Sequence, residues 1–102
     1  MMQVSYDNSG SHATLRLNGS FDMESNAPFR SAYRQALSDS ALRSLTLEFS
    51  GVEYMDSSAL GMLLLLKAEV EKQGATVILA GCKPFVLGVL TTANFHRMFK
   101  IA

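Results

Sequence analysis

The sequence is short of the residues that would tie it to an oxidising compartment or to a membrane. It holds one cysteine, no tryptophan and two prolines in 102 residues. A single cysteine excludes an internal disulfide and fits a reducing compartment. The longest apolar run, Met62 to Leu66, is far shorter than the roughly 20 residues of a membrane-spanning helix. The N-terminus lacks the basic start and apolar run of a signal peptide, so we expect a cytoplasmic protein without direct membrane contact.

An excess of one charge is also absent. Nine Lys and Arg residues balance nine Asp and Glu residues. This balance gives no electrostatic footprint for nucleic acid, so we expect no nucleic-acid partner. Hydrophobic residues make up 48% of the chain and charged residues 18%, which is enough to bury a core. The length suits one domain, and we expect residues 1–102 to form it.

Hydrophobic periodicity predicts alternating strands and helices. Strands are expected at the segments MQVSY, HATLRLNG, RSLTLEFSG, ATVILAG (a buried central strand) and RMFKI. Helices are expected after a cap at Ser25 or Asn26, from Ser57 to about Gln73 with Gly74 as the stop, and from about Pro84 to Asn94. Strand–helix alternation predicts parallel pairing in the second half. We therefore expect an α/β fold with a mixed four- to five-stranded sheet and helices packed mainly on one face.

The helix expected from Ser57 has two apolar sides. At about 100° per residue, one stripe, the expected core face, holds Ala59, Leu63, Leu66 and Val70. The opposite side begins at Ser57, with Ser58 at its edge, and continues through Gly61, Leu64, Leu65, Ala68 and Lys72. Leu65 is the residue of this side least expected to be buried. Two interpretations stay open: neighbouring elements cover Leu64 and Leu65, or both form a docking surface for a partner.

The sequence contains no recognisable pattern of catalytic or metal-binding residues. A serine nucleophile needs a base within hydrogen-bond reach, but His12 lies in an expected turn and His96 near the C-terminus. The carboxylates match no metal-binding loop, and the Gly-x-Ser-x-Gly elbow is missing. Cys82 is expected to be a small residue at a strand end rather than a reactive thiol. We expect no enzyme activity, no metal and no cofactor.

Three neighbouring residues can begin the second helix. Asp56, Ser57 and Ser58 can each accept a hydrogen bond from a free backbone N–H at the helix start. Taken alone, the pattern is typical of an ordinary N-cap and is weak evidence for a function.

Three motifs occur in the order and spacing in which one known family has them. Met55 to Gly61, MDSSALG, is similar to the family's central motif of an apolar residue, Asp, Ser, Ser or Ala, a small residue, Leu and Gly. LNGSFD is similar to the family's LxGxLD and aligns Gly19 and Asp22. GCKPFVLGVLTTANF resembles the strand–Pro–helix segment, with Pro84 in the matching place. Together these motifs resemble the STAS domains of bacterial anti-sigma factor antagonists. The resemblance covers nearly the whole chain and implies a STAS fold.

The resemblance implies a partner switch. In antagonists with this motif the first serine after the aspartate is the phosphoacceptor, which is Ser57 here. The family's partner is an anti-sigma factor that is also a serine kinase. Phosphorylation breaks the complex, and a metal-dependent serine phosphatase restores it. The residues expected to contact the partner are Asp22, Asp56, Ser57, Ser58, Gly61, Leu64 and Leu65, with Ser58 expected to cap the helix.

The local chemistry agrees with such a switch, although a second function stays open. A phosphate on Ser57 adds roughly −1.5 to −2 charges beside Asp56. Free N–H groups at the helix start are expected to tolerate it, while the partner meets new repulsion. The alternative is a STAS subunit bound to the ATPase of a lipid-transport ABC transporter.

Overall fold

The computed structural model describes residues 1–102, whose strands form one five-stranded sheet. In order across the sheet, the strands are β1 (Met2–Ser9), β2 (His12–Phe21), β3 (Ser44–Met55), β4 (Thr76–Ala80) and β5 (Lys100–Ile101). β1 is antiparallel to β2. The remaining neighbouring pairs, β2–β3, β3–β4 and β4–β5, are all parallel. The predicted mixed sheet is confirmed, including its parallel second half.

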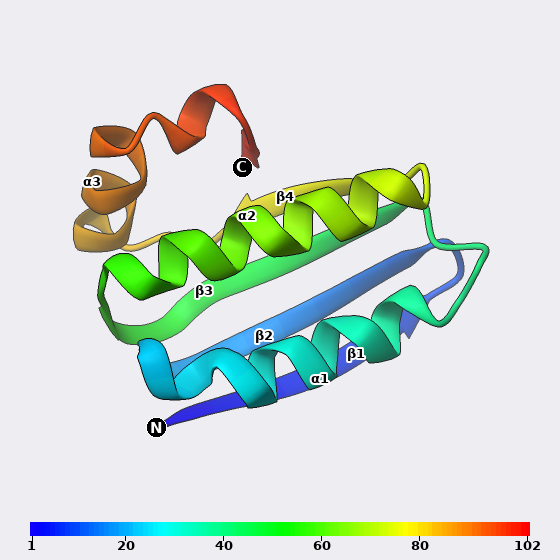
Figure 1. The fold of residues 1–102 in the computed structure, drawn as a ribbon, viewed down its shortest axis with the longest axis horizontal. Helices are drawn as coiled ribbons and strands as arrows, with labels where there is room; N and C mark the ends of the chain where they lie inside the picture. The colour runs from blue at the N-terminus through cyan, green and yellow to red at the C-terminus, as the bar shows by residue number, and fades with distance from the viewer.

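The helices cover one face of this sheet. Helices α1 (Asn26–Leu37) and α2 (Ser57–Lys72) lie side by side across it, while α3 (Pro84–Thr92) stands apart, beside the first turns of α2 (Figure 1). Two short 3₁₀ turns complete the chain, η1 (Met23–Ser25) before α1 and η2 (Phe95–Arg97) before β5. The prediction of helices mainly on one face is confirmed, and the opposite face of the sheet is open.

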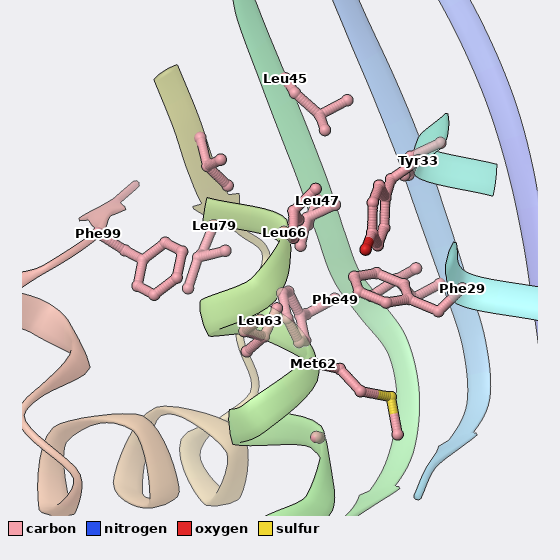
Figure 2. Packing of buried hydrophobic residues seen from close by; sticks show 14 of the residues in the cluster. Phe29, Tyr33, Leu45, Leu47, Phe49, Met62, Leu63, Leu66, Leu79 and Phe99 are labelled. Carbon is pink, nitrogen blue, oxygen red and sulfur yellow. The ribbon is translucent and has the colours of Figure 1, made fainter. Parts of the chain in front are cut away.

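The core lies between the sheet and the two long helices. The predicted stripe of α2, Ala59, Leu63, Leu66 and Val70, is fully buried. It packs against buried side chains of β3, including Leu47 and Phe49, with Phe29 and Tyr33 of α1 beside them (Figure 2). The Phe29 ring centroid lies 5.4 Å from that of Tyr33 in an edge-to-face arrangement. The residues that alternate in β3 and recur in α2 therefore form one cluster.

Two residues end helices through left-handed backbone conformations. Gly74 follows α2 with φ 77°, and Asn94 follows α3 with φ 63°. Both were predicted as stop signals, and both predictions are confirmed. Ser25 and Asn26 were the two candidates for the side-chain cap of α1, and neither acts as one. Ser25 occupies the N-cap position, but its side chain makes no cap hydrogen bond, and Asn26 is the first residue of the helix.

Two predictions about the sheet are wrong: one concerns the burial of β4 and the other the position of His12. β4 was expected to be a buried central strand. It does lie inside the sheet, between β3 and β5, but Ile78 and Ala80 are only half-buried because they face the open side. His12 was placed in a turn. It begins β2 instead, where its ring contacts the hydroxyls of Ser44 and Thr46 on β3.

The last strand is shorter than predicted. Of the segment RMFKI, Arg97 ends η2 and only Lys100 and Ile101 pair with β4.

Adjacent leucines of α2 provide a test of this packing. Leu66→Ala should lower the free energy of unfolding by about 2–5 kcal/mol, because Leu66 is fully buried. Leu65→Ala should change it by less than about 0.5 kcal/mol, because Leu65 is 57% exposed. Urea denaturation of both variants measures the difference, and equal losses would contradict the assigned orientation of α2.

Candidate functional site

The candidate site lies where β2 and β3 end together. Phe21 pairs with Met55 in the parallel ladder, so the next residues, Asp22 and Asp56, begin two neighbouring loops. The backbone N–H of Asp56 donates to the carbonyl of Phe21 at 3.2 Å. Asp22, which follows the last residue of β2, therefore lies beside the loop that leads into α2.

Asp56 caps α2. Its backbone is extended, and its carboxylate accepts the backbone N–H of Ser58 at 2.9 Å. The hydroxyl of Ser58 donates to the same carboxylate oxygen. The predicted start of the helix at Ser57 is confirmed, but the prediction that Ser58 caps it is wrong: Asp56 is the N-cap, and Ser58 supplies the N–H that its carboxylate accepts.

Ser57 stands outside this cap. It is the first residue of α2 and is exposed, whereas Ser58 is half-buried and bonded to Asp56. The N–H of Ala59 also has a partner, the carbonyl of Asp56 at 3.2 Å. Two of the N–H groups that were expected to receive a phosphate at this helix end are thus already bonded.

The outer side of α2 is apolar and exposed. Leu64 is 42% and Leu65 57% exposed, so neighbouring elements do not cover them, and the expectation for Leu65 is confirmed. Gly61 is exposed, and a side chain built on it would contact nothing within 4 Å. A partner can therefore approach the backbone of α2 closely between Ser57 and Leu65.

Sequence analysis missed a second apolar surface next to this one. A groove of about 490 Å³ between α2 and α3 is lined by Leu60, Phe85, Gly88, Val89, Thr92 and Ala93. The signal was present, because the segment PFVLGVLTT of α3 contains no charged residue although only one side of it is buried. Phe85 remains 42% exposed at the groove.

The loops beside Ser57 are acidic. Asp22 caps η1, where its carboxylate accepts the N–H of Glu24 at 3.1 Å. The chain's ion pairs involve the other acids Asp7, Glu69 and Glu71, so neither Asp22 nor Asp56 has a basic side chain as partner. This end of the molecule presents uncompensated negative charge around an exposed hydroxyl.

Other reactive groups do not join the site. Burial, and to a lesser degree the charge of Glu48, raises the pKa of the Cys82 thiol, which therefore stays protonated near neutral pH. His12 lies at the opposite end of β2 from Asp22. No three His, Cys, Asp or Glu side chains converge as a metal site requires. None of the helices has the length and apolar character needed to cross a bilayer.

Comparison with known proteins places the chain in a family. A family model described as "Mlab, STAS domain" matches residues 4–100. A STAS-domain containing protein of Pseudomonas aeruginosa (strain UCBPP-PA14) is 38% identical over 94 residues, which cover 91% of this chain and 90% of that protein. The chain belongs to the STAS-domain family.

Solved structures share its fold. An anti-sigma factor antagonist from Mycobacterium paratuberculosis is 16% identical with a TM-score of 0.86, over 99% of this chain and 85% of that one. The phosphorylated form of the Bacillus cell fate determinant SpoIIAA is 22% identical with a TM-score of 0.73, over 100% of this chain and 91% of that one. The unphosphorylated form, named as an anti-sigma factor antagonist, gives 0.74 at 20% identity, over 100% of this chain and 87% of that one. The predicted STAS fold is confirmed.

The cap assignment gives a second prediction. Asp56→Ala removes the acceptor of the Ser58 N–H and should cost about 0.5–2 kcal/mol of stability. Ser57→Ala should cost less than about 0.5 kcal/mol, because Ser57 is exposed and outside the cap. Thermal or urea denaturation compares the two variants, and a larger loss for Ser57→Ala would refute the division between cap and exposed hydroxyl.

Proposed function

We propose that this STAS domain is an anti-sigma factor antagonist that works by partner switching. It binds an anti-sigma factor with serine-kinase activity when Ser57 is unmodified, and phosphorylation of Ser57 releases it. A metal-dependent serine phosphatase returns it to the binding form. The role is that of a regulatory binding protein, not of an enzyme.

The observation that carries the proposal is the separation of the two serines at the start of α2. The hydroxyl of Ser58 is bonded to Asp56, whereas Ser57 is exposed and takes no part in the cap. A kinase can therefore reach Ser57 without dismantling the helix start. The matched motif of antagonists puts the phosphoacceptor at the same position.

The binding surface is assigned from exposure and position. Gly61, Leu64 and Leu65 continue from Ser57 along the outer side of α2 and are all exposed. Asp22 and Asp56, in the two loops before η1 and α2, and Ser58, in the first turn of α2, are assigned to the adjoining edge of this surface. Burial of the two leucines against a partner contributes apolar area that folding leaves in water.

Electrostatics supplies the release step. A phosphate on Ser57 brings roughly −1.5 to −2 charges to an end where Asp22 and Asp56 already lack basic partners. In the complex the phosphate would lose its hydration. It would also lie against the partner groups that contact the uncharged Ser57 hydroxyl in the unmodified state. Binding is weakened without any need for the domain to refold.

The alternative, a STAS subunit on the ATPase of a lipid-transport ABC transporter, is not better supported by the comparisons. The two functions differ in which partner the chain retains and in whether the state of Ser57 matters. A permease-associated ATPase held equally by wild type and Ser57→Asp would favour the alternative.

The proposal is tested by affinity capture from the source cells with wild type, Ser57→Asp and Ser57→Ala as baits. Wild type and Ser57→Ala should retain an anti-sigma factor kinase, and Ser57→Asp should lose at least about tenfold of it, because one added charge enters the interface. Ser57→Ala should accept no phosphate from that kinase with ATP. Equal phosphorylation of Ser57→Ala and wild type would overturn the site assignment.

The docking surface has a separate test. Leu65→Glu should weaken kinase binding by about tenfold or more while leaving the melting temperature nearly unchanged, because the side chain is exposed in the free domain. Ser5→Glu places the same charge on the open face of the sheet and should bind as wild type does. Calorimetry and thermal unfolding measure the two effects; unchanged binding by Leu65→Glu would remove α2 from the interface.

A further inference from the structure

Ser25 is the only buried polar or charged residue in the chain. It is 1% exposed and is the last residue of η1, which follows Asp22 of the candidate site. A buried hydroxyl is costly unless its hydrogen bonds are made. The partners of Ser25 therefore indicate what the residue does.

All the side-chain bonds of Ser25 point back into the loop that ends β2. Its hydroxyl donates to the carbonyl of Ser20 at 2.9 Å and accepts the backbone N–H of Asp22 at 3.0 Å. Its own backbone N–H donates to the carbonyl of Asp22 at 2.9 Å. The hydroxyl gives no cap bond to α1, although Ser25 occupies the N-cap position of that helix. Its bonds thus hold the end of β2 rather than the start of α1.

The segment between these bonds reaches the phosphoacceptor loop. Ser20 and Asp22 flank Phe21, and the carbonyl of Phe21 accepts the N–H of Asp56 at 3.2 Å. Asp56 in turn caps α2 through Ser58 and immediately precedes Ser57. A chain of hydrogen bonds therefore runs from the buried hydroxyl of Ser25 to the residue before the exposed hydroxyl.

We propose that Ser25 is a positioning residue for the recognition of Ser57, acting through the Phe21 carbonyl and the Asp56 cap. This inference rests on the proposed function, since it concerns the same site. Without the Ser25 hydroxyl, the N–H of Asp22 and the carbonyl of Ser20 lose their partner. The peptide between Phe21 and Asp22 can then rotate, and its carbonyl no longer fixes Asp56. Asp22 and Ser57 lose their fixed spacing, although the rest of the sheet is unchanged.

Three variants separate positioning from general stability. Ser25→Ala removes the hydroxyl, and Ser25→Thr keeps it. Ala36→Gly is the matched control, because it weakens α1 at a buried position that has no contact with the hydrogen-bond chain. A purely structural role would make Ser25→Ala and Ala36→Gly behave alike.

The first measurement is amide hydrogen exchange by NMR and needs no partner. In Ser25→Ala the Asp56 amide should exchange at least about tenfold faster relative to the Leu47 amide in the middle of β3. In Ser25→Thr and Ala36→Gly that ratio should stay at the wild-type value. An unchanged ratio in Ser25→Ala would overturn the proposal.

The second measurement is phosphorylation of each full-length variant in extract of the source cells with γ-³²P-ATP, with Ser57→Ala as the blank. Ser25→Ala should raise the apparent KM by about tenfold, since the acceptor is misplaced, and Ser25→Thr should restore it. Ala36→Gly should behave as wild type. An apparent KM of Ser25→Ala equal to that of wild type would overturn the proposal.

The two measurements test different claims, so one claim can be refuted while the other stands. If wild type receives no phosphate at Ser57, the proposed function fails. The exchange ratio at Asp56 still decides whether Ser25 positions this loop.

Discussion

The functional end of the molecule depends on the parallel pairing of β2 with β3. The two strands run in the same direction, and their ladder reaches Phe21 and Met55. Both strands therefore end on the same side of the sheet, and the loops that follow them begin next to each other. The aspartates that follow are brought together by this constraint, although 33 residues lie between them in the sequence. On the other side of β2, Gly19, with φ 95°, allows the start of the chain to approach closely, because a Cβ there would meet the carbonyl oxygen of Met1 at 2.2 Å.

The leucine run of α2 shows how folding and binding divide one helix. A straight helix with about 3.6 residues per turn cannot direct four consecutive side chains to one side. Leu63 and Leu66 are buried against the sheet and α1, whereas Leu64 and Leu65 remain exposed to solvent. Polar residues would serve equally well at exposed positions of a stable helix, so the fold does not require leucine there, and the proposed docking surface gives these side chains a role.

Local patterns predicted the parts of the structure that local geometry determines. The alternation that buries Leu45 and Leu47 and the stop at Gly74 each follow from a few neighbouring residues. The cap of α2 could not be assigned this way, because three adjacent residues all favour that position and the choice depends on the residue at which the helix begins. The half-exposure of Ile78 and the groove beside Phe85 depend on which elements cover a surface, and sequence periodicity does not carry that information.

A filled cap at the start of α2 favours a switch that acts on the surface. If free N–H groups awaited the phosphate, modification would draw Ser57 into the helix end and neutralise part of the added charge. Here Asp56 already bonds the N–H of Ser58, so under the proposed function a phosphate on Ser57 would have to displace that carboxylate or project into solvent. Displacement would exchange one anion for another at a cost in cap stability, so projection is the easier outcome.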